Sequence, residues 1–207
     1  MKGRYGLWLV VVLILGVTGV VRVPWSWGHG NGAAKDPVIQ AYKAVNRALK
    51  ASPIRWKEVE KRFGKIRSVV AKMDEEYSAG LLRPMEAAIR AGRAGADQSH
   101  HAKSLLEGFH RIFFFLIRHN LENAEARLGE FGKAKALLGH AKQYYAILAP
   151  LVKNAEPADD AAVRKTFKEA LKALGRPAAF GFGNKPPDPD RFRAAARRVD
   201  EILSKRF

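Results

Sequence analysis

The chain contains no cysteine, and this absence removes several classes of function at once. Disulfide bonds, thiolate zinc sites, covalent haem attachment through CxxCH, a lipidated cysteine anchor and thiol catalysis all need that residue. Common catalytic motifs are missing as well: there is no GxSxG, no HExxH, no P-loop and no glycine-rich dinucleotide turn. We therefore predict a protein that is not an enzyme.

Acidic residues are scarce relative to basic ones. The chain has 20 Asp and Glu against 37 Lys and Arg, so its formal net charge is +17. A charge of this size favours contact with something anionic. We predict an anionic membrane surface or a membrane-bound transport partner rather than nucleic acid, because the first residues indicate export. The alternative is a basic surface that is only solvated.

The most apolar run of the chain lies near its start. Lys2 and Arg4 precede Leu7–Val21, a segment without any charged residue. A basic segment followed by an apolar one is typical of a signal peptide. Gly28-His29-Gly30 would suit cleavage, whereas two nearby tryptophans would suit a retained membrane anchor. Both alternatives place the rest of the chain outside the cytoplasm.

This pattern divides the chain into three parts. Residues 1–30 are expected to be a signal peptide or an N-terminal membrane anchor, and residues 31–35 a flexible, glycine-rich tether. Residues 36–207 are expected to be one exported domain. That domain would lie in the periplasm or be held at the outer face of the cytoplasmic membrane.

No segment alternates apolar and polar residues convincingly at the period of a β-strand, whereas helix caps recur after residue 36. We predict an all-α fold, an antiparallel helical bundle of about five to six helices. RFGK followed by LLRPMEAA (62–88) resembles EFGK followed by ILAPLVKNA (130–155). Two repeated helical hairpins would explain this echo, and convergence on helix-favouring residues is the alternative.

Helix starts are predicted at N-cap residues. The cap followed by proline occurs at Asp36-Pro37, Ser52-Pro53 and Asp188-Pro189. Further caps are expected at Asp97 or Ser99 and at Asp159 or Asp160.

Helix ends are predicted at glycine and proline. Pro84 should kink or divide the long segment that follows Ser52. A helix from about His100 to Leu128 should break or bend near Gly129 and Gly132, and Gly175 should end the penultimate helix.

The stretch EGFHRIFFFLIRHNLE (107–122) combines an apolar helix face with two histidines. On a helix, its large apolar residues share one broad sector, while Arg111 and Arg118 lie opposite. Phe114 and Phe115 fall on the two flanks of that sector. We therefore expect this helix to bury more than half of its circumference.

Each histidine has a glutamate one turn away on the same face. Glu107 precedes His110, and Glu122 follows His119. Imidazole and carboxylate at this spacing can share a metal ion, as in helical bundles with two-iron sites. The two pairs lie on nearly opposite edges of one helix, so they cannot hold the same ion. The alternative for each is a hydrogen-bonded structural pair.

A metal at either pair would need carboxylates from a neighbouring helix. The candidates are Glu75, Glu76 and Glu86.

The segment GFHRI (108–112), preceded by Tyr77, Pro84 and Glu86 in YSAGLLRPMEAAI, resembles the imelysin-like helical proteins. These include the periplasmic iron-uptake component of the bacterial ferrous-iron transport system. The likeness covers about residues 36–205, including the helices of AKQYYAILAPLVKNAEPADDAAVRKTFKEALKAL. It implies a helical bundle with a metal-binding His-x-x-Glu pair, in which His110 would be the histidine. The glutamate of that motif is replaced here by Phe113, so Glu107 or the pair His119/Glu122 would have to serve.

Three functions remain open at this point. The chain would bind iron or another divalent metal for uptake or handling, or be a structural or adaptor bundle at the membrane that has lost the metal site. A bundle that binds haem non-covalently is the least favoured, with His110 or His119 and Met73 or Met85 as axial ligands.

Overall fold

The structure, a computed structural model, describes residues 36–176 and 185–207. This part of the chain holds eight α-helices and no strand, apart from an isolated bridge between Arg176 and Lys185. The helices are α1 (Pro37–Leu49), α2 (Trp56–Gly64), α3 (Arg67–Tyr77), α4 (Leu82–Arg93), α5 (Gln98–Glu125), α6 (Phe131–Ala155), α7 (Pro157–Ala173) and α8 (Pro189–Leu203). The predicted all-α fold is confirmed, with more and shorter helices than expected. The predictions for residues 1–35 lie outside the described residues.

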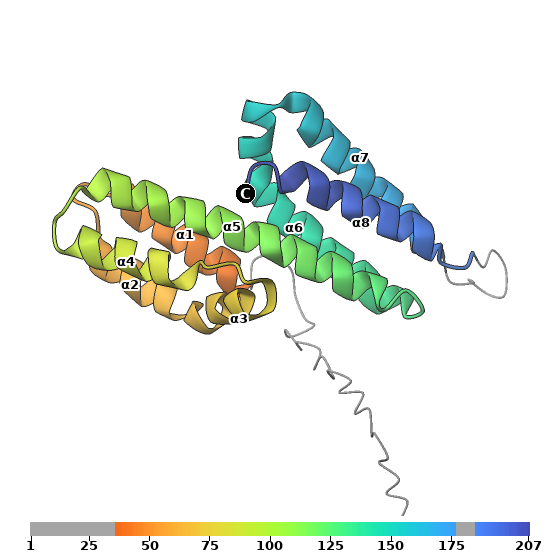
Figure 1. Ribbon diagram of the computed structural model, residues 1–207, viewed down its shortest axis with the longest axis horizontal. Helices are drawn as coiled ribbons and strands as arrows, with labels where there is room; N and C mark the ends of the chain where they lie inside the picture. Colours follow the sequence, from red (N-terminus) through yellow and green to blue (C-terminus); the bar gives the residue numbers. More distant parts are fainter. Residues whose placement is uncertain (1–35, 177–184) are drawn as a thin grey trace, which may run out of the picture. The chain divides into compact units, whose positions relative to one another are not determined.

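The longest helix, α5, is shared by two groups of helices (Figure 1). In the first group α1 packs on α2, α2 on α4, and α4 and α1 on α5. In the second group α6 and α8 pack on α5, and α7 packs between α6 and α8. The 28 residues of α5 span about 42 Å at 1.5 Å per residue, which is enough for both groups.

The shared position of α5 explains its apolar residues. Its N-terminal half packs on one set of neighbours and its C-terminal half on another, so the buried side changes along the helix. Phe114 and Phe115 are accordingly buried along with the central apolar sector. The expectation that this helix buries more than half of its circumference is confirmed.

Several predicted caps are confirmed. Asp36 Oδ1 accepts from the backbone N–H groups of Val38 and Ile39, each at 2.9 Å. Asp97 caps α5 through the N–H of His100, and Asp188 caps α8. Each side chain accepts a donor that lacks an intrahelical partner. Gly175 has a φ of +74° just after α7, as a terminal glycine should.

Two predicted helix starts are wrong. Ser52-Pro53 lies in the connection after α1, and α2 begins at Trp56. The penultimate helix is capped by Glu156, with Pro157 at its first position, rather than by Asp159 or Asp160. Glu is not among the residues preferred at N-caps, and Glu156 Oε1 accepts from the N–H of Ala158 at 3.4 Å.

Pro84 does not divide a helix, contrary to the prediction. It lies in the first turn of α4, where the backbone N–H groups have no intrahelical acceptor and proline is tolerated. The chain breaks earlier, after α3, where Ser78 and Gly80 both have positive φ. Asp74 stabilises this α3–α4 turn by accepting from the N–H groups of Leu81 (2.7 Å) and Leu82 (2.9 Å).

The two similar sequence passages occupy different structural contexts. Residues 62–65 end α2, and residues 81–88 begin α4 after a separate helix. Residues 130–133 instead begin α6, and residues 147–155 are the end of that same helix. The passages therefore do not form equivalent hairpins.

None of the described helices combines the length and the apolar character needed to cross a membrane.

Candidate functional site

The phenylalanines of α5 serve packing. Phe109 and Phe113 are fully buried. The ring of Tyr42 on α1 lies 5.7 Å from Phe109 and 5.2 Å from Phe113, measured between centroids. Phe113 also contacts Tyr144 of α6, whose hydroxyl donates to the α1 cap Asp36 at 2.6 Å. This cluster ties the start of α1 to the shared helix.

His110 lies among aromatic rings rather than carboxylates. Its ring is 6.1 Å from Tyr42 and 6.5 Å from Phe207, between centroids. Glu107 points to solvent with 61% of its side chain exposed, and its Oε1 lies 4.0 Å from Lys103 Nζ. Burial lowers the pKa of His110, and the charge of Glu107 opposes that shift. Among the described residues, no carboxylate from a second helix joins this predicted pair.

The partly buried imidazole of His110 should make stability depend on pH. Because its pKa is lower in the folded chain than the ordinary 6.5, the unfolded chain takes up this proton more readily. The stability contributed by neutral His110 is complete above about pH 6.5 and is lost as the pH falls through the folded-state pKa. We expect His110→Gln to melt with a shallower pH dependence than wild type between about pH 7.5 and pH 5. Circular dichroism checks this, and equal slopes would contradict it.

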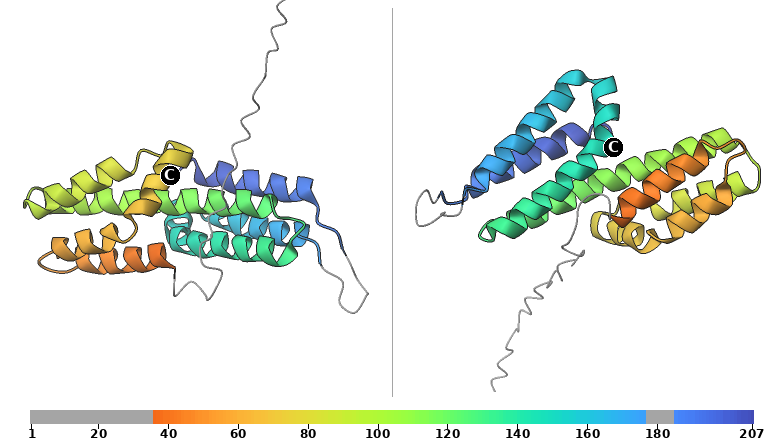
Figure 2. Two further views of the ribbon diagram at one scale, coloured as in Figure 1. Left: turned by 90° about the horizontal axis from the view of Figure 1, so that it is seen from below. Right: turned by 180° about the vertical axis from the view of Figure 1, so that it is seen from behind.

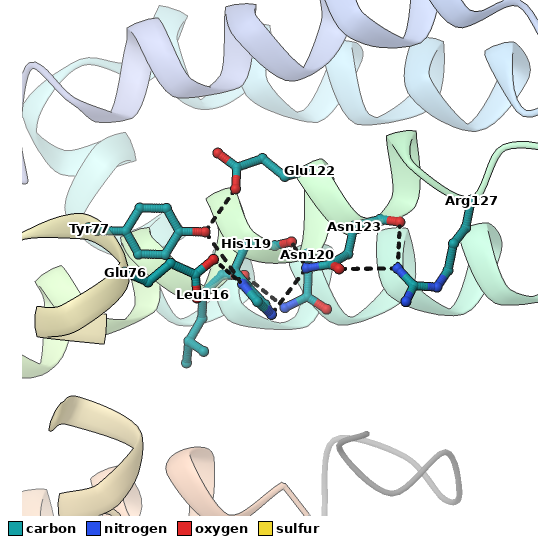
Figure 3. A network of polar contacts seen from close by, with 8 residues as sticks. All are labelled: Glu76, Tyr77, Leu116, His119, Asn120, Glu122, Asn123 and Arg127. Atoms are coloured by element: carbon teal, nitrogen blue, oxygen red, sulfur yellow. Dashed lines mark hydrogen bonds and ion pairs between the residues drawn. The ribbon is translucent and has the colours of Figure 1, made fainter. Parts of the chain in front are cut away.

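The second predicted pair, His119 and Glu122, lies in a polar network between α3 and α5 (Figure 3). Glu76 Oε1 lies 3.2 Å from His119 Nδ1, and the Tyr77 hydroxyl donates to Glu122 Oε2 at 2.8 Å. The same hydroxyl is 3.4 Å from His119 Nδ1. On the other side of the ring, Asn123 Nδ2 lies 3.1 Å from His119 Nε2. The network thus joins side chains more than 40 positions apart.

The partners of Asn123 indicate which nitrogen of His119 carries the proton. Arg127 Nη1 lies 3.1 Å from Asn123 Oδ1, and a guanidinium can only donate. The Asn123 amide nitrogen therefore faces His119, where it donates to the backbone carbonyl at 2.8 Å and to Nε2. Since Nε2 accepts, Nδ1 holds the proton and donates it to Glu76.

Tyr77 lies at the centre of the network. Its ring stacks on Phe115 with centroids 5.4 Å apart and an interplanar angle of 26°. Burial, followed by the negative charge of Glu122 and the hydrogen bond to it, raises the pKa of the Tyr77 hydroxyl far above its usual value. The phenol is therefore a hydrogen-bond donor at neutral pH, and it donates to Glu122 while lying 3.4 Å from His119 Nδ1.

The α3–α4 turn fixes Glu76 and Tyr77 in front of α5. These residues end α3, immediately before the turn that Asp74 stabilises. From α5, Arg111 Nη2 donates to the carbonyl of Ala79 in the same turn at 3.0 Å. The turn is thus held from both of its sides, and the two side chains project toward His119.

A pair of charged groups flanks the network on the α8 side. Arg118 donates through Nε and Nη2 to the two carboxylate oxygens of Asp200, each at 2.7 Å. The guanidinium also lies over the ring of Phe114, 5.1 Å from its centroid. Hydrogen bonding to Asp200 raises the pKa of Arg118, and the charge of Glu122 adds to that rise. Arg118 thus contributes a fixed positive charge beside Glu122.

Of the three carboxylates predicted from neighbouring helices, the structure brings one to a histidine. Glu76 reaches His119, whereas Glu86 accepts from Arg67 Nε at 2.7 Å and Glu75 is exposed. The sequence did not predict that the Tyr77 hydroxyl would bond to Glu122 in this network. The position of Tyr77 at the end of a helix, next to a candidate carboxylate, was the available signal.

The other residues singled out in the sequence lie away from this network. His100 and His101 contact each other at the start of α5, with ring centroids 5.4 Å apart. Met73 and Met85, the alternative haem ligands, are buried in the core. Met85 packs against Gly108, where an added Cβ would lie 2.7 Å from Met85 Cγ.

Within the described ranges, no three His, Asp or Glu side chains are already spaced to hold one metal ion. The carboxylate of Glu76 reaches the imidazole of His119, whereas the carboxylate of Glu122 is bonded to the Tyr77 hydroxyl beside that ring. A metal ion at this place would exchange those hydrogen bonds for bonds to the ion.

Comparisons with protein-family models, with curated proteins and with solved structures found nothing that matches this chain. The likeness to the imelysin-like proteins therefore stays a prediction that rests on the residues quoted above.

Proposed function

We propose that the chain is an exported, non-enzymatic helical-bundle protein that binds iron or another divalent metal ion for uptake or handling. The proposal is supported by one observation above all: Glu76 of α3 lies 3.2 Å from the imidazole whose own helix supplies Glu122. Helical spacing alone offers one carboxylate beside His119. The α3–α4 turn adds a second carboxylate, that of Glu76. The sequence showed that a carboxylate from a neighbouring helix would be needed, but it did not show which one.

The donor atoms at this site define the class of ion. One imidazole nitrogen, two carboxylates and a phenol oxygen suit Fe²⁺, Mn²⁺ or Zn²⁺. Because the chain has no cysteine, a thiolate site for softer ions is excluded. His119 Nδ1, which faces Glu76 and Tyr77, would be the ligating nitrogen, and the proton of the neutral imidazole would then lie on Nε2.

Metal binding through Nδ1 would require a hydrogen-bond acceptor at position 123. A histidine that ligates through Nδ1 normally donates its Nε2–H to an oxygen acceptor. Asn123 now presents its amide nitrogen there, held by Arg127. Asn123→Asp would place an acceptor opposite Nε2, and we therefore expect it to tighten metal binding.

Metal titration of matched variants tests the proposal. We expect wild type to bind Fe²⁺ or Mn²⁺ under anaerobic conditions, and His119→Ala and Glu76→Gln to bind with dissociation constants at least about 10–100-fold higher. His110→Ala is the matched control, since no described residue of a second helix brings a carboxylate to that histidine, and it should bind like wild type. Isothermal titration calorimetry measures the constants.

Two outcomes would contradict the proposal. One is the absence of binding in wild type at millimolar ion. The other is a loss in His110→Ala that equals the loss in His119→Ala, which would move the site to the other pair.

The second candidate is a structural or adaptor bundle. It is favoured by the fact that both nitrogens of His119 already have partners. In that case the network fastens α3 to α5, and His119→Ala lowers the melting temperature without any change in response to metal. Tyr77→Phe should then behave in the same way, because it removes the hydroxyl that bridges to Glu122.

A further inference from the structure

Helices α1 and α2 carry two stripes of basic side chains. On α1, Lys43 and Arg47 are followed by Lys50 at the C-cap, and on α2 Lys57 and Lys61 are followed by Lys65 at the C-cap. Spacings of three and four residues place each stripe on one side of its helix. All six side chains are exposed. We call these six residues the α1–α2 basic face.

The two stripes lie on the same outer layer of the first helix group. Figure 2 (left) shows α1 and α2 side by side, with α4 and α5 forming the layer above them in that view. The core residues of α1 include Val45, and those of α2 include Val59 and Phe63. On a helix these apolar residues point roughly opposite to the basic stripes. The stripes therefore point away from the core.

The charges of this face are not balanced by acidic neighbours. Helix α1 contains no Asp or Glu, and its cap Asp36 is engaged by Tyr144 and two backbone N–H groups. On α2, Glu58 pairs with two arginines and Glu60 pairs with Arg93 of α4.

Consequently, within the described part of the chain, none of the six basic side chains has an ion pair or a side-chain hydrogen bond. These six unpaired cations form a positively charged surface across two helices, and no acidic side chain among the described residues neutralises it.

We propose that the α1–α2 basic face docks on an anionic phospholipid surface. Five of the six cations are lysines, which act as flexible point charges rather than as the rigid forks that arginine offers to nucleic-acid phosphates and bases. The large apolar side chains that the described residues expose are Leu151 on α6 and Leu171 on α7, away from this face. Docking is therefore electrostatic and peripheral, without an inserted apolar wedge.

The place of this face in the sequence favours lipid over an acidic protein. Asp36, at the start of α1, follows the apolar run that ends at Val21 by only 15 residues. A chain of that length reaches at most about 50 Å. The choice of lipid over an acidic protein rests on the proposed export of the chain to the membrane. The experiment below tests lipid docking and attachment through the apolar run separately.

The absence of cysteine allows one fluorescent probe to be placed at will. Gly64 lies between Lys61 and Lys65, and a Cβ added there meets nothing within 4 Å, so Gly64→Cys reports on the basic face. Ala161→Cys on the exposed side of α7 is the control probe. The full chain is mixed with vesicles whose headgroups carry a quencher. Vesicles of phosphatidylcholine alone are compared with vesicles that also contain phosphatidylglycerol.

We expect quenching of the Gly64 probe, but not of the Ala161 probe, that requires phosphatidylglycerol. It should disappear in about 1 M NaCl, where the screening length falls to about 3 Å. The triple variant Lys57→Gln, Lys61→Gln, Lys65→Gln should weaken docking by on the order of tenfold to a hundredfold.

Helix α7 offers a matched charge control. Lys165, Lys168 and Lys172 form a similar exposed stripe on the same helix as Glu169. The corresponding triple glutamine variant removes the same charge, and we expect it to leave the Gly64 signal unchanged.

Equal quenching of both probes, or equal loss in both triple variants, would overturn the proposal in favour of unspecific charge attraction. A Gly64 probe that responds to an added acidic polypeptide or to DNA but not to vesicles would overturn it in favour of another partner.

Flotation with pure phosphatidylcholine vesicles tests the apolar run separately. A chain that floats only with phosphatidylglycerol, and whose Gly64 probe is quenched, supports docking while contradicting an N-terminal anchor.

Discussion

Replacing Phe113 by alanine should lower the free energy of unfolding by about 3–5 kcal/mol, the range for truncation of a buried phenylalanine. The ring is 0% exposed. Its centroid lies 5.2 Å from Tyr42 of α1 and 5.9 Å from Tyr144 of α6. These helices belong to different groups, so the cavity would open where both groups pack on α5. The Tyr144 hydroxyl is bonded to Asp36 at 2.6 Å, which limits how far that ring can move into the space.

Chemical unfolding followed by circular dichroism measures this loss. In a domain of this size it corresponds to a fall in melting temperature of roughly 6–20 °C. Phe131→Ala is the matched control, because Phe131 is only partly buried at the start of α6, where its ring lies beside Lys135. Its effect should be much smaller. A loss below about 1 kcal/mol in Phe113→Ala would show that the cluster is not a packed core.

The sequence predicted α5 well because local and tertiary requirements agree there. The apolar residues recur at helical spacing, and Asp97 provides a cap, so the start, length and burial of the helix follow from neighbouring residues. What the sequence did not reveal is that two helix groups share it. That sharing requires different buried sides in its two halves, and the flanking positions of Phe114 and Phe115 were the local sign.

The division of the segment after Ser52 was predicted less well. The prediction treated Pro84 as a helix breaker. Proline breaks a helix in its interior but is tolerated in the first turn, so its position decides the effect. Pro84 costs little in the first turn of α4. The real break uses positive φ values at Ser78 and Gly80, stabilised by Asp74 four residues before Ser78. A side chain that satisfies backbone donors seven residues further along is hard to find by local rules.

The polar network was predictable only in part. Helical spacing placed Glu122 beside His119, and the need for another carboxylate put Glu76 among three candidates. Which of the three would be used depends on where the α3–α4 turn lies against α5, a contact 43 positions apart in the chain. For His110 the same reasoning could not foresee that the last residue of the chain, Phe207, would lie beside the imidazole.

Gly92→Ala should destabilise the domain by about 2–3 kcal/mol, although alanine is the better helix former. A Cβ added at Gly92 would lie 2.3 Å from Trp56 Cζ2 and 2.4 Å from Cε2, well inside van der Waals contact. The indole is a rigid plane, only 5% exposed, so it has little room to move. Helix α4 must therefore separate from α2, which loosens the layer behind the basic face.

Gly139→Ala is the matched control, because Gly139 also lies inside a helix but an added Cβ there meets nothing within 4 Å. The same substitution should stabilise α6 by about 0.5–1 kcal/mol, since it reduces only the conformational freedom of the unfolded chain. The two variants should thus shift the unfolding midpoint in opposite directions. If Gly92→Ala were neutral or stabilising, Trp56 could not be packed against α4 as the structure has it, and the contact between α2 and α4 would have to be redrawn.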